Sequence, residues 1–388
     1  MTTYQVEQGI LTAASQHTNA YFAAAELADA LQHEHLGFVL FFCSAEYDLA
    51  GLADALESHF PSTLLSGCTT AGEITPLGYD RGTIVAMGFD RRLFAVETAL
   101  IDDLDHFELT HAQPLVDGLL ARCRRQTIAP INAHSFVLTL LDGLSSREEQ
   151  VLATLDAALG HIPSFGGSAG DDNHLSHTHV YTAGRFHSHA AVVVMINTRL
   201  PFEVFSTHHL TPLTHKLVVT EVNREHRRVI ELNGLPAAQV YADLVGVAPE
   251  QLSAVIFARH PLAVRIGGQH YVRSIQRVHS DGSLSFYCAV ENGIVLTAMQ
   301  STPLLENLKM MLAGVSARLG TPSVIIGCDC FLRRMELEAL DHVEQASQLL
   351  RQAGVVGFNT YGEQHHGMHV NQTFTGVAFG SLPAFDHY

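Results

Sequence analysis

One short pattern occurs twice in this chain and restricts how it can fold. The pattern is G-x-x-T-x-G-E, which spans Gly67–Glu73 and again Gly357–Glu363. Each copy follows a short apolar run of the kind that forms a buried strand. A looser third copy is the glycine-rich segment Phe165–Asp171. Because self-similarity of this kind marks a repeated structural unit, the sequence predicts a fold assembled from related pieces.

The residues before each copy repeat as well. An apolar segment typical of a strand comes first, and a stretch with apolar residues at helical spacing follows it. The order strand, helix, strand and glycine loop is therefore predicted three times. The predicted strand and helix pairs are 38–43 with 48–60, 136–142 with 147–159, and 324–330 with 336–352.

Antiparallel strands are predicted beside these units. Apolar residues alternate along Leu284–Val290, and a turn at 280–283 joins this segment to Tyr271–Val278 as a hairpin. A change of sequence character at 200–222 marks a boundary between domains. We therefore predict an α+β protein of two related lobes, 1–222 and 223–388, in which mixed and antiparallel sheets are layered with helices.

Charge and hydropathy exclude some classes of partner. The chain has 22 Lys and Arg residues and 39 Asp and Glu residues, which gives a formal net charge of −17. This charge argues against binding to nucleic acid or to an anionic membrane. The N-terminus has no secretory signal pattern, and no apolar run approaches the roughly 20 residues of a membrane span. The six scattered cysteines are predicted to be reduced and buried. These features predict a cytoplasmic protein.

Several segments together resemble one family. They are Gly67–Glu73, Phe165–Asp172, 217–241, and Gly357–Glu363 with the following 369–374. In their order and number they resemble the FIST family over nearly the entire chain, with a FIST N-like lobe at 1–222 and a FIST C-like lobe at 223–388. Within that family, Cys328–Arg334 and the segments GFNTYGEQ and HVNQTFTG are similar to the nitric-oxide-sensing haemoprotein branch, NosP.

The resemblance implies a function that residue patterns alone do not give. It implies a non-enzymatic, cytoplasmic sensor that binds haem b (iron protoporphyrin IX) without a covalent link and takes up nitric oxide at the iron. The implied partner is a histidine kinase in a two-component phosphorelay that controls cyclic-di-GMP and biofilm behaviour. The alternative is a FIST sensor that binds a small organic ligand, such as an amino acid, without haem. The resemblance leaves open whether the protein is a homo-oligomer.

The axial ligand of such a haem is expected to be a histidine. The chain has no C-x-x-C-H motif, so a haem would be held non-covalently, and a neutral imidazole leaves the opposite iron face free for a diatomic gas. Among 25 histidines we favour His209, which lies at the boundary between lobes in an otherwise apolar segment. Further candidates are His208, His215, His365, His366 and His369.

The glycine loops supply the remaining candidates for a binding pocket. Arg259, Arg265, Arg273 and Arg277 lie on the predicted antiparallel sheet, and one or two of them, Arg273 and Arg277 first, are candidates to pair with haem propionates. Cys328 and Cys330 are first interpreted as core residues and second as a redox-sensitive or zinc-binding pair, and no metal other than haem iron is predicted. The loop candidates are Gly67, Thr70, Gly72, Glu73, Gly166, Gly167, Gly357, Thr360, Tyr361, Gly362, Glu363 and Asn371.

An enzyme is the least favoured interpretation. Nucleophile types such as Cys68, Thr70 and Ser168 stand close to Glu73 and Asp171 in the sequence. A nucleophile also needs a base within reach and an oxyanion pocket, which sequence spacing does not establish. We therefore predict a binding protein, and a hydrolase-like activity is the less favoured alternative.

Overall fold

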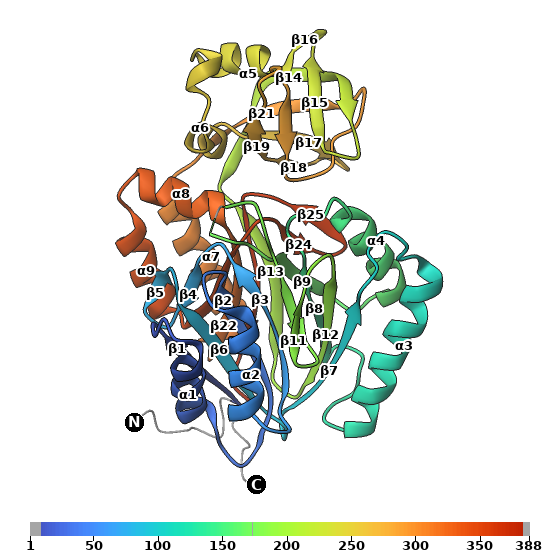
Figure 1. Ribbon diagram of the computed structural model, residues 1–388, viewed down its shortest axis with the longest axis vertical. Coiled ribbons are helices and arrows are strands. Elements are labelled where there is room, and N and C mark those ends of the chain that lie inside the picture. The colour runs from blue at the N-terminus through green and yellow to red at the C-terminus, as the bar shows by residue number, and fades with distance from the viewer. Residues whose placement is uncertain (1–8, 173, 383–388) are drawn as a thin grey trace.

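The computed structural model describes residues 9–172 and 174–382, which form three related units and one inserted domain (Figure 1). Each unit runs strand, helix, strand, helix, strand, short hairpin and closing strand. The first contains β1 (Ile10–Ser15), α1 (Ala20–Leu31), β2 (Leu36–Ser44), α2 (Leu49–His59), β3 (Leu64–Thr70), β4 (Glu73–Thr75), β5 (Gly78–Asp80) and β6 (Ile84–Asp90).

The second unit repeats this order of elements. It contains β7 (Phe94–Ile101), α3 (Leu109–Gln126), β8 (Ser135–Leu141), α4 (Glu148–Leu159), β9 (Ser164–Ser168), β10 (Val180–Thr182), β11 (Arg185–His187) and β12 (Ala191–Thr198). The repeat predicted from the glycine loops therefore extends to whole units.

The third unit follows the same order but is interrupted after its first strand. It contains β13 (Phe202–His208), α7 (Leu304–Leu319), β22 (Val324–Cys330), α8 (Phe331–Ala339), α9 (Val343–Gln352), β23 (Val355–Thr360), β24 (Glu363–His365), β25 (Met368–Val370) and β26 (Thr373–Phe379). Two helices here, α8 and α9, occupy the place of the single second helix in the other units.

The interruption is a β-rich domain that lies at one end of the three units (Figure 1). Its sheet has the order β18-β17-β21-β14-β15-β20-β19, and β16 pairs with β15. It contains β14 (Leu210–Asn223), β15 (Arg228–Leu232), β16 (Leu235–Pro236), α5 (Ala237–Val245), a 3-10 turn (Pro249–Gln251), α6 (Ala254–Arg259), β17 (Leu262–Ile266), β18 (Gln269–Arg273), β19 (Ile275–Val278), β20 (Leu284–Phe286) and β21 (Val295–Ser301). We call residues 210–301 the inserted domain.

The three units exchange their short hairpins in a cycle. The sheets have the orders β1-β6-β2-β3-β10-β11, β7-β12-β8-β9-β24-β25 and β13-β26-β22-β23-β4-β5. Each sheet has a parallel central pair, and its last two strands come from a different unit. No unit can therefore complete its own sheet.

Glycine permits the close approach of the central strands in all three units, and the two full copies of the pattern show how. A Cβ atom at Gly67 would lie 2.3 Å from the carbonyl oxygen of Phe41, its neighbour in register on β2. A Cβ atom at Gly357 would lie 1.8 Å from the carbonyl oxygen of Gly327 on β22. The first glycine of the G-x-x-T-x-G-E pattern is thus required by strand packing.

The three sheets pack their inner faces together and cover their outer faces with helices. Along β2, Phe38, Leu40 and Phe42 point into the central core, while Val39 and Phe41 pack under α1 and α2. Both faces of these strands are buried, which explains their continuous apolar sequence. The helices α3 and α4 cover the second sheet, and α7 and α9 cover the third.

The predicted α+β class with mixed and antiparallel sheets is confirmed. The division predicted between residues 222 and 223 stays a prediction, and in the structure this point lies at the end of β14. Within the described residues, no helix has the length and apolar character needed to cross a membrane.

The central core provides a direct test of this packing. Phe358 on β23 is fully buried and stacks on Phe42 of the first unit, with ring centroids 4.3 Å apart. Phe358→Ala is expected to lower the free energy of unfolding by roughly 3–5 kcal/mol, measured by urea denaturation followed by circular dichroism. The control Phe22→Ala, at a side chain that is 54% exposed, should change it by less than about 0.5 kcal/mol. Equal effects of the two substitutions would contradict the packing described here.

Candidate functional site

The three glycine loops, 70–73, 168–172 and 359–363, meet at the centre of the three units. Each loop follows the second strand of a parallel pair and hydrogen-bonds through its backbone to the other two. The N–H groups of Ala71, Asn359, Ser168 and Gly170 donate to the carbonyl oxygens of Asn359 (2.9 Å), Gly72 (2.7 Å), Gly362 (2.8 Å) and Thr69 (3.0 Å), respectively. We call these segments the loop centre.

Glu73 carries a buried carboxyl group inside the loop centre. It accepts hydrogen bonds from the hydroxyl of Thr70 and from both the N–H (3.1 Å) and the hydroxyl (2.8 Å) of Thr83. Burial raises its pKa to about 7, although the bonds from Thr70 and Thr83 oppose this shift.

Glu363 repeats this arrangement in the third unit. It accepts hydrogen bonds from the hydroxyl of Thr360 and from the N–H (3.0 Å) and the hydroxyl (2.9 Å) of Thr373. Burial again raises the pKa to about 7 against the effect of these bonds. The T-x-G-E signature therefore encodes a buried carboxyl group that fastens the loop to the closing strand of its own unit.

The looser third copy uses an ionised carboxylate. Asp171 accepts hydrogen bonds from the N–H groups of Leu175 (2.9 Å), Ser176 (2.7 Å) and His177 (2.9 Å), and from the hydroxyl of Tyr361. Burial alone would raise its pKa, but these hydrogen bonds lower it below the usual value.

The predicted loop candidates are buried within or around this centre. Asn371, for example, accepts a hydrogen bond from the N–H of Ser274 (3.1 Å) and so ties the third unit to the inserted domain. None of the loop candidates lines the two cavities described next. Their role as ligand contacts stays a prediction, whereas their structural role follows from these contacts.

A cavity of about 640 Å³ lies between the inserted domain and the hairpin β24–β25. It contains four imidazoles, those of His208, His270, His365 and His366, among mainly apolar side chains. The other lining residues are Ser206, Leu210, Pro212, Gln269, Tyr271, Val272, Met299, Met368, Val370 and Thr373. We call this space the seam cavity.

His365 is the histidine of the seam cavity that is best prepared to bind a ligand. Burial, followed by the neighbouring His366, lowers its pKa to about 4, so the ring is neutral at physiological pH. Its Nδ1 atom is buried and has no hydrogen-bond partner among the described residues. By contrast, Nδ1 of His208 accepts a hydrogen bond from the N–H of Leu210 (3.3 Å).

His209, the histidine favoured from the sequence, is buried but does not line the seam cavity. Its Nδ1 lies 2.9 Å from Nη1 of Arg333 and its Nε2 lies 2.8 Å from Oε2 of Glu336. Because arginine only donates, Nδ1 accepts and the Nε2–H group donates to the carboxylate. Burial lowers the pKa of His209, so the ring is neutral and both nitrogens are engaged.

The other histidine candidates lie apart from the seam cavity. His215 is exposed on β14. His369 is buried, with Nδ1 3.1 Å from Oε1 of Glu149. Burial alone would lower its pKa, but the neighbouring Cys288, Glu148 and Glu149 raise it well above the usual value. Of the histidines named from the sequence, the structure thus places His208, His365 and His366 at the seam cavity, and which of them binds a ligand stays a prediction.

The segment Cys328–Arg334 contributes buried charge. Arg333 is fully buried and donates to Asp329 (2.7 Å), which accepts from the hydroxyl of Tyr79 (2.5 Å). Cys328 and Cys330 are buried in different apolar clusters, and burial raises the pKa of both thiols well above the usual value. Sequence reasoning missed Arg333 and Glu336, although their spacing on one helix face was visible.

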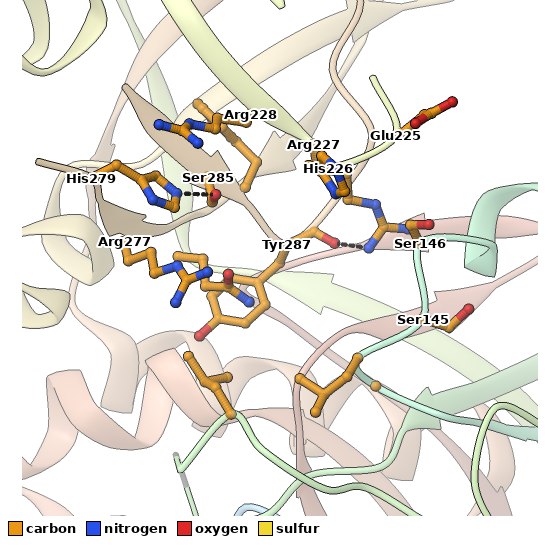
Figure 2. A pocket seen from close by; sticks show the side chains of 15 residues that line it. Ser145, Ser146, Glu225, His226, Arg227, Arg228, Arg277, His279, Ser285 and Tyr287 are labelled. Carbon is orange, nitrogen blue, oxygen red and sulfur yellow. Dashed lines mark hydrogen bonds between the residues drawn. The ribbon is translucent and has the colours of Figure 1, made fainter. Parts of the chain in front are cut away.

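A second, more polar cavity of about 440 Å³ lies at the edge of the inserted domain. Figure 2 shows Arg277, Arg228, His226 and His279 around it. Nε2 of His279 lies 2.6 Å from Oγ of Ser285. The other lining residues are Gly143, Leu144, Ser145, Ser146, Leu175, Glu225, Arg227, Gln276, Phe286 and Tyr287. We call this space the basic cavity.

The two arginines predicted to bind propionates lie in different surroundings. Arg277 is exposed at the basic cavity. Arg273 is buried and donates to the carbonyl oxygens of Ala289 (3.1 Å) and Val272 (3.1 Å). Neither arginine lines the seam cavity.

The raised pKa values of Glu73 and Glu363 predict a pH dependence of stability. Each carboxyl group holds its proton up to about pH 7 in the folded chain, against an ordinary value of 4.5. The folded state thus binds more protons across this window, so the free energy of unfolding should fall as pH rises from about 4.5 to 7 and level off above it. The slope is at most roughly 1.4 kcal/mol per pH unit for each group.

Glu73→Gln and Glu363→Gln should each reduce this slope, as measured by urea unfolding between about pH 5 and pH 8. The control Glu34→Gln, at an exposed carboxylate, should retain the slope of the unmodified protein. An unchanged slope in both buried variants would show that these carboxyl groups do not hold protons in the folded state.

Comparison with known proteins assigns the chain to a family. The FIST N domain model matches residues 37–235, and the FIST C domain model matches residues 237–366. No curated protein matches the sequence. Solved structures of T. maritima PurL, complexed with AMPPCP and with FGAR, give TM-scores of 0.21 and 0.20 at 10% identity over 96% of this chain and 72% of theirs, a likeness too weak to support any argument. FIST domains are sensory domains that bind small ligands. With both models matched, most of the chain is covered, and it belongs to the FIST family.

Proposed function

We propose that this FIST protein senses nitric oxide through a non-covalent haem b in the seam cavity and regulates a histidine kinase. The kinase would act in a phosphorelay that controls cyclic-di-GMP and biofilm behaviour, as the resemblance to NosP implies. The observation that supports this proposal is the seam cavity itself, an apolar space of about 640 Å³ with four imidazoles. Its volume lies within the roughly 300–1,000 Å³ of small-molecule sites.

The residues of the seam cavity fit a haem. Leu210, Val272, Met299 and Val370 are almost completely buried and offer apolar contact to a flat macrocycle. His365 offers a neutral, desolvated imidazole whose Nδ1 lacks a partner, which suits iron coordination. The haem would supply an iron atom able to bind nitric oxide.

In this proposal His365 would hold the haem iron, and His209 has a positioning role. Coordination by His209 would break its contact with either Arg333 or Glu336 inside the core. Its carbonyl oxygen also accepts from the N–H (2.8 Å) and the hydroxyl (2.6 Å) of Thr302, where the chain returns from the inserted domain. His209 therefore links the two chain segments, at residues 209 and 302, that connect the inserted domain to the third unit.

Cations for the propionates lie at the edge of the seam cavity. An adjoining surface cleft shares Pro212 and His270 with the cavity and is also lined by Lys216 and Arg265. Ammonium and guanidinium groups at this edge suit carboxylates that point toward solvent. We assign the propionates to Lys216 and Arg265 in preference to Arg273 and Arg277.

The location of the seam cavity provides a route for a signal. One wall belongs to the inserted domain and the other to β24–β25, the hairpin of the third unit that completes the sheet of the second unit. Occupancy would change how these elements pack, and the altered surface would be presented to the kinase. The contribution of the chain is thus to bind, orient and respond, and we propose no enzymatic step.

The test is an absorption series on the full chain expressed with haem supplied. The unmodified protein should show a Soret band that shifts between ferrous, ferrous–CO and ferrous–NO forms. His365→Ala should lose haem or show an altered ferrous spectrum because the axial imidazole is removed, and the exposed control His215→Ala should match the unmodified protein. Absence of a Soret band contradicts haem binding, and an unchanged spectrum in His365→Ala contradicts the assigned ligand.

A second candidate function is supported by the basic cavity. Arg277, Arg228 and His226 surround it in a protein whose net charge is −17, which favours a small carboxylate such as an amino acid. This alternative would stand if haem-supplied protein showed no Soret band while amino acids raised the unfolding temperature, and if Arg277→Ala abolished that increase.

A further inference from the structure

A thiol, an imidazole and a carboxylate meet where three parts of the fold join. Glu149 lies on α4 of the second unit, Cys288 follows β20 of the inserted domain, and His369 lies on β25 of the third unit. One ligand atom from each of these side chains lies within 4.8 Å of the other two. Cys288 and His369 are buried, and the Glu149 side chain is 26% exposed.

One nitrogen in this cluster lacks a hydrogen-bond partner. Nδ1 of His369 lies 3.1 Å from Oε1 of Glu149, but Nε2 is buried and has no hydrogen bond within the described residues. A further carboxylate oxygen, Oε1 of Glu148, lies 3.9 Å from this Nε2 atom. A Cβ atom at Gly362 would lie only 1.9 Å from Nε2, so the backbone of Gly362 packs directly against the His369 ring and no residue with a side chain fits there.

We propose that Glu149, Cys288 and His369 bind a zinc ion. Thiolate sulfur, imidazole nitrogen and carboxylate oxygen are the donors that Zn²⁺ takes in proteins. Zinc bonds of about 2.0 to 2.3 Å place tetrahedral donors roughly 3.2 to 3.8 Å apart, so modest side-chain movements bring this set into coordination. Glu148, whose Oε1 lies 3.9 Å from Nε2 of His369, adds negative charge beside these three donors.

The charges around the cluster suit a divalent cation. Glu148, Glu149 and the thiolate of Cys288 would supply three negative charges. Nη2 of Arg227 lies 2.5 Å from both Glu148 and Glu149 and supplies one positive charge. A zinc ion adds the two positive charges that balance the group. Arg227 binds the Oε2 atoms of both glutamates, while Oε1 of Glu149 accepts a hydrogen bond from the N–H of Ala289 (2.7 Å) and lies 3.1 Å from Nδ1 of His369.

The zinc site is structural and separate from the proposed haem site. None of its three ligands lines the seam cavity. The ion would join residues 149, 288 and 369, and thereby connect two units and the inserted domain. Because its ligands come from three parts of the fold, the ion would stabilise the arrangement of these parts. It would fix one edge of the inserted domain while the seam cavity opens at another.

The test uses the full-length chain, free of haem and treated with a chelator. Addition of Co²⁺ should give d–d bands together with a thiolate-to-cobalt charge-transfer band, and Zn²⁺ should displace the cobalt. Cys288→Ser should abolish the charge-transfer band, and Glu149→Gln should weaken binding by at least roughly tenfold. The control Cys123→Ser alters a buried cysteine outside the cluster and should retain the band.

Circular dichroism identifies any variant that fails to fold. If Cys288→Ser does not fold, the metal affinity of Glu149→Gln, a substitution at a partly exposed side chain, tests the proposal. If the unmodified protein with Co²⁺ showed no charge-transfer band, the proposal would be overturned. A band in folded Cys288→Ser, or unchanged affinity in Glu149→Gln, would also overturn it. Because the measurement needs no haem, the outcome is independent of the proposed nitric oxide function.

Discussion

The structure depends on three loops that hydrogen-bond to one another at the centre of three units. Glu73 and Glu363 fasten two of these loops, because each buried carboxyl group binds one threonine inside its loop and another at the start of the closing strand. The chain leaves the loop centre as a short hairpin that completes the sheet of another unit. A unit therefore gains its full set of strand partners only when all three are assembled.

This constraint determines where a ligand can bind. The loop centre is filled by its own backbone and side chains, and the cores on either side of each sheet are filled by apolar residues. The seam cavity and the basic cavity lie where the inserted domain faces the three units. The glycine loops thus position a site without forming its walls. They place β24–β25 beneath the inserted domain, and the hairpin carries His365 and His366 to the seam cavity.

Much of the fold could be predicted from the sequence, because local signals were strong. The G-x-x-T-x-G-E pattern identified the repeat, since its first glycine is required by strand packing and its glutamate by the threonines around it. The burial of His209 followed from its apolar neighbours. The exchange of hairpins could not be predicted, because strands as short as β4 or β24 have too few residues for their sequence to indicate which strand they pair with.

The sites were harder to predict because they join distant segments. The seam cavity combines residues near 208, 270 and 365, and the proposed zinc ligands are residues 149, 288 and 369. The engagement of His209 by Arg333 and Glu336 also arises only in three dimensions. The sequence could name His365 as a candidate, but the reason to prefer it, an unpartnered and desolvated nitrogen, required the structure.

The central claim is that the sensory ligand occupies the seam between the inserted domain and β24–β25. Hydrogen–deuterium exchange measured by mass spectrometry, with and without haem, tests it most directly. The account predicts slower exchange in peptides that cover both walls, 262–273 and 363–373, and no change around 225–228 at the basic cavity. Protection at the basic cavity alone, or no change at either wall, would contradict it.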